Sequence, residues 1–146
     1  MVDHAGYSDE YLRRILSAVR NIAVVGASPR HERPSHRVMA YLQRRGYHTI
    51  PVNPNSAGAV VLGERCYARL ADIDEPIDMV DVFRRSAAAG EVVDAAIAAG
   101  AKIVWMQLGV RDAAAAARAA AHGLEVVMDR CPAIEIPRLG LPPLRR

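Results

Sequence analysis

The feature that most constrains the fold of this chain is a regular alternation of short apolar runs with segments of helical periodicity. Runs that are mostly apolar over the length of a strand and lead into turn residues are NIAVVGAS (21–28), YHTIPVNP (47–54), IDMVDVF (77–83), KIVWMQ (102–107) and LEVVMD (124–129). Strands of this kind are typical of a parallel sheet that is covered by helices on both faces and connected by right-handed crossovers. The sequence therefore predicts an α/β fold with a buried parallel sheet.

Helical periodicity occupies the segments that flank these runs. In the first helix, about residues 8–20, Ser8 can accept hydrogen bonds from the first turn, and acidic residues follow it directly. Further helices are expected at residues 35–46, 86–100 and 111–123. Ser35 is the predicted N-cap of the first of these three, and Gly46 is its stop signal.

The remaining segments are less regular. Residues 60–63 predict a short strand and residues 66–73 a short helix, whereas the proline-rich tail at about 137–146 predicts an irregular segment on the surface. A length of 146 residues is typical of one domain. We therefore expect residues 1–146 to form a single domain, with the helix at 8–20 as an N-terminal extension.

The charge pattern and the cysteines argue against several classes of protein. The net charge is only +3 and the basic residues form no long stripe, so we expect no nucleic-acid partner. Cys66 and Cys131 belong to no CxxC motif, so neither a zinc ribbon, a disulfide framework nor another metal site is expected. The N-terminus lacks the apolar region of a signal peptide, and no run of about 18 apolar residues could span a membrane. A cytoplasmic protein is expected.

The end of the first apolar run is the first place to look for a ligand, because open parallel sheets bind ligands outside the carboxyl ends of their strands. Gly26 allows close approach of the backbone, and the following helix directs its positive N-terminus toward the same place. Arg30 and Arg33 could pair with phosphate oxygens. A tight strand-to-helix connection with solvated arginines is the alternative interpretation.

Two common nucleotide motifs do not fit this loop. A dinucleotide fingerprint requires GxGxxG, but Gly26 is followed by Ala27, Ser28 and Pro29. The second strand ends in Asn53 rather than in the acidic residue that would hold the ribose of NAD. A Walker sequence is also absent. Ordinary NAD and ATP sites are therefore disfavoured.

Polar residues, glycines and arginines also follow the later strands, in DVFRRS (81–86), MQLGVR (106–111) and MDRCP (128–132). Together with VVGASPRHERPS and PVNP, these motifs resemble the CoA-binding domain family, small proteins similar to the nucleotide-binding domain of the succinyl-CoA synthetase alpha subunit. The resemblance runs from about Asn21 to about Ile136. It implies a Rossmann-like, doubly wound parallel sheet in a single three-layer domain that holds coenzyme A, free or acylated, across its strand ends.

The resemblance also implies a role for each strand end. Residues near the phosphates of the ADP moiety would be Gly26, Ala27, Ser28, Arg33 and Ser35. Residues beside the adenosine would be Asn53 and Pro54, and those lining the adenine or its phosphates Val82, Phe83 and Arg84. The middle of the cofactor would contact Gln107, Gly109 and Val110, and the pantetheine end would be closed by Met128, Asp129, Arg130 and Cys131.

The synthetase needs a phosphorylated histidine and a second domain, and no histidine of this chain is expected in such a domain: not His4, His31, His36, His48 or His122. We interpret His36 as a helix-surface residue and His48 as a strand-edge residue. Asp78 and Asp81, three apart on one strand, would face opposite ways and form no catalytic pair.

Cys131 is interpreted as a small buried cysteine, with a nucleophile or a thiol partner of CoA as the alternatives. We expect a CoA-binding protein without catalytic activity and with an unknown protein partner. The alternatives are a small NAD(P)-dependent oxidoreductase and a regulatory module with an empty site.

Overall fold

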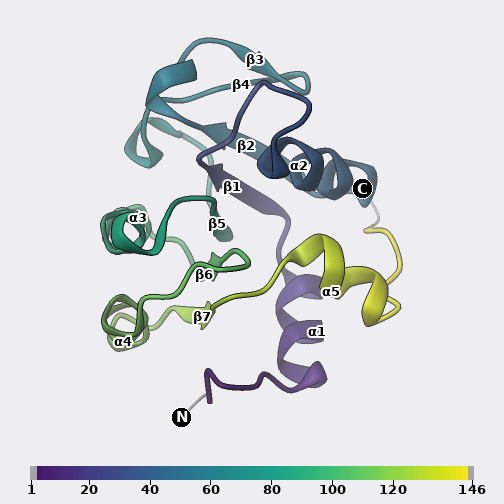
Figure 1. Ribbon diagram of the computed structural model, residues 1–146, viewed down its shortest axis with the longest axis vertical. Helices are drawn as coiled ribbons and strands as arrows, with labels where there is room; N and C mark the ends of the chain where they lie inside the picture. Colours follow the sequence, from purple (N-terminus) through teal and green to yellow (C-terminus); the bar gives the residue numbers. More distant parts are fainter. Residues whose placement is uncertain (1–2, 145–146) are drawn as a thin grey trace.

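A five-stranded parallel sheet lies at the centre of the molecule in the computed structural model, which describes residues 3–144 (Figure 1). Its strands are β1 (Asn21–Val25), β2 (His48–Val52), β5 (Met79–Val82), β6 (Ile103–Met106) and β7 (Glu125–Val127). Their order in the sheet is β2-β1-β5-β6-β7, and all neighbouring pairs are parallel. The predicted α/β fold with a doubly wound parallel sheet is confirmed.

Helices cover both faces of this sheet (Figure 1). They are α1 (Asp9–Ala18), α2 (Pro34–Arg44), α3 (Ser86–Ala98), α4 (Ala113–Ala121) and α5 (Pro132–Arg138). Figure 1 shows α3 and α4 on one face and α1, α2 and α5 on the other. The longest of them, α3, has 13 residues, and no helix within residues 3–144 has the length and apolarity of a membrane span.

The alternation of side chains along each strand divides the core into two parts. On the α1, α2 and α5 side, Ile22 and Val24 of β1 pack with Trp105 of β6 and with the large aliphatic residues of the helices. On the α3 and α4 side, Ala23 and Val25 pack against small residues, because both helices are rich in alanine. Close packing of alanine helices against the sheet explains how a chain with few aromatic residues fills its core.

The segment between β2 and β5 crosses the end of the sheet. It contains a 3-10 helix (Pro54–Ser56), a hairpin of β3 (Val60–Val61) and β4 (Glu64–Arg65), and a second 3-10 helix (Leu70–Asp72). The short strand predicted at 60–63 is therefore present. Of the helix predicted over 66–73, only the 3-10 turn at Leu70–Asp72 is present. The start of the predicted helix is extended instead, because the N–H of Tyr67 donates to the carbonyl of Pro51 at 2.9 Å.

The C-terminal segment is irregular from Leu139 to Leu144, as predicted, but it is not a surface tail. Helix α5 extends to Arg138, and beyond it Leu139 and Leu141 are buried in the core. The backbone N–H of Leu144 donates to the carbonyl of Arg45 at 2.8 Å, which holds the segment against the end of α2. Apolar residues spaced between prolines bring this segment into the core, and the prolines concealed their helical spacing in the sequence. Residues 145–146 lie outside the described residues.

Candidate functional site

The carboxyl ends of all five strands lie at one edge of the sheet, because the strands are parallel. Strand β2, which follows β1 in the chain, lies on one side of β1. Strands β5, β6 and β7 lie on the other side of β1. The point between β1 and β5 is therefore the switch point, where folds of this type bind ligands. Three cavities lie around it.

The first, which we name the switch-point cleft, has a volume of about 420 Å³. Its lining residues are Gly26, Ser28, Arg30, Arg33, Pro34, Ser35, Asn53 and Phe83. Side-chain hydrogen bonds fix the shape of its loop: Ser28 N–H donates to Ser35 Oγ at 3.1 Å, and Asn53 Nδ2 donates to the carbonyl of Ala27 at 2.8 Å. Ser35 and Asn53 thus hold the β1 loop in place as well as facing the cleft.

Gly26 is required here by the protein itself. Its φ is +92°, and a Cβ added to it would lie 2.2 Å from the carbonyl oxygen of Phe83. Because Gly26 N–H also donates to the carbonyl of Val52 at 2.8 Å, the loop is held between the ends of β2 and β5. Only glycine combines this conformation with this approach.

The start of α2 differs from the prediction. Arg33, not Ser35, is the N-cap residue, and Pro34 is the first residue of the helix, as proline's fixed φ and missing N–H favour. Ser35 is free to accept from Ser28 because it does not cap the helix. The helix still begins beside the switch-point cleft, so the positive end of its dipole favours an anion there.

The second cavity, the β6-side cleft, has a volume of about 630 Å³ and shares Pro34 and Phe83 with the first. Its other lining residues are Arg37, Val38, Arg84, Arg85, Gln107, Leu108, Gly109, Val110 and Cys131. The loop after β6 turns back on itself: Val110 N–H donates to the carbonyl of Gln107 at 2.9 Å, and Gly109 has a φ of +82°. A tight turn of this kind needs glycine at that position.

The third cavity, the α3 groove, has a volume of about 620 Å³ and shares Arg84 with the β6-side cleft. Its wall is mainly apolar and includes Leu70 and Ile73 beside Val92 and Ala95 of α3. One end of the groove includes Val52 and Pro54, at the carboxyl end of β2. The three cavities therefore adjoin one another around the switch point.

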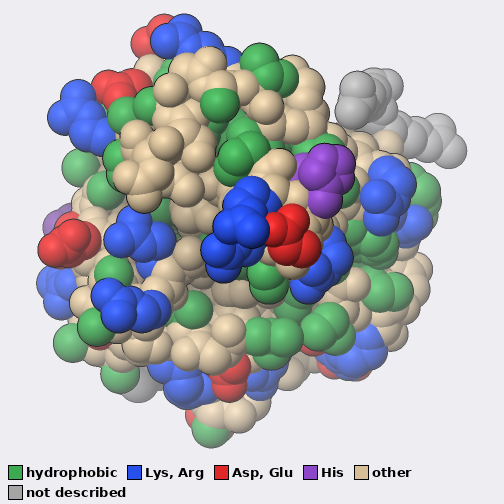
Figure 2. Space-filling view, turned by 45° about the horizontal axis from the view of Figure 1, so that its top comes forward, with side chains coloured by type: hydrophobic (Ala, Val, Ile, Leu, Met, Phe, Trp, Pro, Cys, Tyr) green, Lys and Arg blue, Asp and Glu red, His purple; other side chains and the backbone are tan. Residues whose placement is uncertain are grey.

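Arginines carry the charge of this region. Within residues 3–144, the side chains of Arg33, Arg84 and Arg85 form no ion pair and no hydrogen bond, whereas Arg30 pairs with Glu32 at 2.8 Å. Figure 2 shows basic side chains in separate groups on this side of the molecule, and not as a continuous stripe. Unpaired guanidinium groups beside a helix N-terminus form a site for phosphate oxygens.

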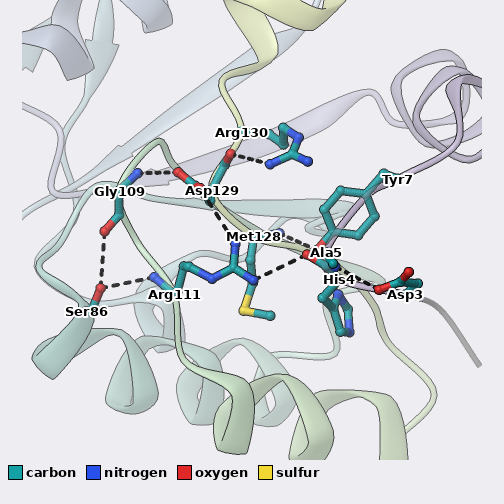
Figure 3. A network of polar contacts seen from close by, with 10 residues as sticks. All are labelled: Asp3, His4, Ala5, Tyr7, Ser86, Gly109, Arg111, Met128, Asp129 and Arg130. Carbon is teal, nitrogen blue, oxygen red and sulfur yellow. Dashed lines mark hydrogen bonds and ion pairs between the residues drawn. The ribbon is translucent and has the colours of Figure 1, made fainter.

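A polar network supports the far side of the β6-side cleft (Figure 3). Asp129 Oδ1 accepts from Gly109 N–H at 2.7 Å, and Ser86 Oγ donates to the carbonyl of Gly109 at 3.2 Å. The Arg130 guanidinium lies 5.2 Å from the ring centroid of Tyr7. Asp129 has the unusual φ of +58°, which its hydrogen bond to the β6 loop helps to maintain. Asp129 and Arg130 therefore hold neighbouring segments together and line none of the three cavities.

The predicted site residues thus fall into separate groups. The cavities include Gly26, Ser28, Arg33, Ser35, Asn53, Pro54, Phe83, Arg84, Gln107, Gly109, Val110 and Cys131. Residues that point into the core are Ala27, Val82 and Met128. In the β6-side cleft, the lining residues absent from the predicted set are Pro34, Arg37, Val38, Arg85 and Leu108. In the α3 groove, only Pro54 and Arg84 belong to the predicted set. Arg85 follows Arg84 in a strand-end motif, a signal that would have found it.

The histidine expectations are correct in part. His36 is not a helix-surface residue: it is 8% exposed, and desolvation, aided by the nearby His31, lowers its pKa. Its ring lies 4.7 Å from that of His31. His48 lies on the edge strand β2 as expected, and its Nε2 is 2.6 Å from a carboxylate oxygen of Glu75.

Clefts at the switch point of a doubly wound parallel sheet define a Rossmann-like α/β domain of the kind that binds nucleotides. More specifically, the chain belongs to the CoA-binding domain family: the model of that family, described as a CoA binding domain, matches residues 20–137.

The chain is also similar to individual proteins. The chain is 39% identical over 120 residues to the uncharacterized protein YneT of Bacillus subtilis (strain 168), covering 82% of this chain and 87% of that protein. A hypothetical protein from Pyrococcus horikoshii OT3 matches with a TM-score of 0.87 and 42% identity, over 92% of this chain and 93% of that one. A dinucleotide-forming acetyl-coenzyme A synthetase from Ca. Korarchaeum cryptofilum shares the fold, with a TM-score of 0.66 and 23% identity over 82% of this chain and 27% of the enzyme.

Proposed function

We propose that this protein binds coenzyme A, free or acylated, without catalysing a reaction of its own. The observation that carries the proposal is the group of three arginines, Arg33, Arg84 and Arg85, on adjoining cavities at the switch point, whose side chains have no partner within residues 3–144. Coenzyme A carries a pyrophosphate and a 3′-phosphate, and planar guanidinium groups bind such anions through paired hydrogen bonds. The family assignment supports the same ligand.

Each cavity suits one part of this ligand. The switch-point cleft, with its backbone loop and the start of α2, would hold the pyrophosphate. The apolar end of the α3 groove that includes Val52, Pro54 and Arg84 would hold the adenine, and the 3′-phosphate on the adjoining ribose would then lie near an arginine. The pantetheine arm would then lie in the β6-side cleft, which adjoins the pyrophosphate site through Phe83.

The lining of the two clefts supports a binding role over a catalytic one. Within residues 3–144, neither the switch-point cleft nor the β6-side cleft includes a histidine, aspartate or glutamate among its lining residues, whereas Glu75 and Glu91 line the α3 groove. General acid–base catalysis relies on side chains of these kinds within hydrogen-bond reach of the substrate. We therefore expect no formation of succinyl-CoA from succinate, CoA and ATP or GTP.

The test compares the melting temperature of the protein with CoA, dephospho-CoA and NAD. At a hundredfold excess over Kd, CoA should stabilise the folded state by about 2.7 kcal/mol, or very roughly 5–10 °C for a domain of this size. NAD should give a clearly smaller shift. Arg84→Gln should weaken CoA binding by about 10- to 150-fold and reduce the difference between CoA and dephospho-CoA, because a charge-assisted contact is worth about 1.5–3 kcal/mol.

Arg44→Gln is the matched control, since Arg44 is exposed at the opposite end of α2 and lines none of the cavities. It removes the same charge and should leave CoA binding unchanged. A shift with NAD as large as that with CoA would favour the oxidoreductase. No shift with any nucleotide would favour an interaction module with an empty site.

A further inference from the structure

Cys131 lines the β6-side cleft, between the end of β7 and the start of α5. Its side chain is 5% exposed, which confirms a buried cysteine. Burial alone is typical of a structural cysteine, because free cysteine packs like a small apolar residue. What distinguishes Cys131 is the cavity that it lines and the second buried group in that lining.

That second group is the amide of Gln107. Its side chain is 7% exposed, and its Oε1 accepts no hydrogen bond within residues 3–144. A buried carbonyl oxygen without a protein donor is unfavourable, and a water or a ligand must supply the missing hydrogen bond. Gln107 lines the β6-side cleft, although its Oε1 is covered in this structure. A ligand amide in the cleft can donate to this oxygen once the side-chain amide turns toward it.

The remaining surface of the cleft is largely apolar, with Val38, Phe83, Leu108 and Val110 among its lining residues. An apolar channel with one amide acceptor and one thiol suits the pantetheine arm of CoA. The arm is a flexible chain with amide N–H groups in its middle and a sulfur atom at its end. The amide N–H groups would satisfy Gln107, and the sulfur would then approach Cys131.

We propose that Cys131 forms a mixed disulfide with CoA by exchange with the disulfide of CoA, a step that rests on the proposed function. The Cys131 thiol first releases its proton to solvent, and the thiolate attacks one sulfur of the CoA disulfide. A bond between Cys131 Sγ and the bound CoA sulfur forms as the original S–S bond breaks. The departing CoA thiolate takes up a proton. The protein thiol is oxidised and the departing CoA is reduced, so no further oxidant is required.

The burial of Cys131 makes this reaction selective. A disulfide that does not bind in the clefts meets a thiol that is almost fully covered, whereas a bound CoA disulfide is held beside it. Cys66 provides the internal comparison. It is also buried, but it lines none of the three cavities. Its Sγ lies 3.7 Å from the carbonyl oxygens of Asn53 and Tyr67, and burial raises the pKa of its thiol.

The experiment treats the reduced, full-length protein with CoA disulfide and follows the intact mass over time. Wild type and Cys66→Ser should each gain one CoA moiety, which dithiothreitol removes, and Cys131→Ser should gain none. Glutathione disulfide at the same concentration should modify Cys131 at least tenfold more slowly. An excess of acetyl-CoA, whose sulfur is blocked as a thioester and which competes for the clefts, should slow the reaction with CoA disulfide.

Three results would overturn the proposal: no adduct on the wild type, an equal adduct on Cys131→Ser, or glutathione disulfide reacting as fast as CoA disulfide. The melting temperature of Cys131→Ser with reduced CoA separates this failure from that of the proposed function. If CoA stabilises this variant and the wild type forms no adduct, CoA binding stands and the exchange reaction is wrong. If CoA stabilises neither protein, the proposed function is itself wrong.

Discussion

Glycines with positive φ occur at many turns of this protein, and Gly26 and Gly109 show that the reason for glycine differs from turn to turn. At Gly109 a Cβ would meet no atom within 4 Å, so only the backbone conformation requires glycine. At Gly26 the conformation and the approach of Phe83 both require it. From the sequence alone, Gly26 is interpreted as the residue that lets a ligand approach the backbone. On that interpretation, Gly26→Val should block ligand binding and leave the fold intact or modestly weakened. The structure adds a contact inside the protein that such a substitution would break.

Alanine substitutions at the two positions separate these effects. Gly109→Ala should lower the free energy of unfolding by about 1–2 kcal/mol, the cost of left-handed backbone for an L-residue. Gly26→Ala should cost at least about twice as much, because a Cβ located 2.2 Å from the carbonyl oxygen of Phe83 forces the two strand ends apart. Urea denaturation of both variants measures the difference. Equal decreases in the free energy of unfolding would show that the close contact between Gly26 and Phe83 does not add to the cost of the substitution.

At the scale of elements, tyrosines from the N-terminal region cover the exposed edge of the sheet at β7. Tyr11 of α1 donates its hydroxyl to the carbonyl of Val126 at 2.8 Å and accepts from the N–H of Val126 at 3.2 Å. Tyr7 accepts from the N–H of Met128 at 2.8 Å and stacks on Tyr11 (Figure 3 shows Tyr7). These hydroxyls occupy backbone groups that an edge strand would otherwise offer to another chain. The N-terminal helix is thus an integral part of the sheet edge.

Tyr11→Phe should therefore lower the free energy of unfolding by about 1–3 kcal/mol, because both backbone groups of Val126 lose their partner in a half-buried place. The backbone amide of Val126 should also exchange its hydrogen faster. Tyr41→Phe is the control, since the Tyr41 hydroxyl makes no hydrogen bond within residues 3–144 and the ring is similarly half-buried. If the free energy of unfolding falls equally in the two variants, the Tyr11 hydroxyl does not stabilise the edge strand and only the packing of the Tyr11 ring does.

The elements that the sequence predicts well are those defined by local signals. The Ser8 cap is confirmed, since its Oγ accepts from Tyr11 N–H at 3.1 Å, and each apolar run is a strand of the sheet. The tyrosine contacts across β7 join residues more than 100 positions apart, and no local pattern reveals them. Helix α5 escaped prediction because Pro132 and Pro137 interrupt its spacing, although proline is favoured at the first position of a helix.

At the scale of the whole molecule, the sequence predicts where the site lies better than which side chains face it. Parallel strands bring their carboxyl ends to one edge, so strand-end motifs could be assigned to the site without coordinates. The direction of each side chain depends on the register of the sheet. Val82 and Met128 belong to such motifs, yet both are buried in the core on the α3 and α4 side. The basic side chains on the cavities, by contrast, are long enough to reach a ligand from exposed positions.

The central strand of the sheet, β5, contains the carboxylate of Asp81, with which no cationic side chain pairs within residues 3–144. Asp81 of β5 lies between Val24 and Trp105 on the neighbouring strands and is fully buried. Neither of its oxygens has a hydrogen-bond partner within residues 3–144. Asp81 and Asp78 therefore differ in environment as well as in direction, because Asp78 lies just before β5 and accepts from the N–H groups of Arg20 and Asn21 at 2.9 Å. Desolvation raises the pKa of Asp81 well above its ordinary value of 3.8.

This buried carboxyl should make the stability of the whole domain depend on pH. A raised pKa means that the folded protein retains a proton that the unfolded chain has released, so the stability contributed by protonated Asp81 is complete below about pH 4. It is lost as the pH rises toward the folded-state pKa, at up to about 1.4 kcal/mol per pH unit. Asp81→Asn, which carries no titrating proton, should therefore gain stability relative to wild type as the pH increases from 4 to 8, measured by urea denaturation.

Asp74→Asn is the control. It removes a carboxylate from an exposed loop, and its stability relative to wild type should show no such trend with pH. A constant difference between Asp81→Asn and wild type at every pH would mean that Asp81 titrates in the folded protein as it does in the unfolded chain.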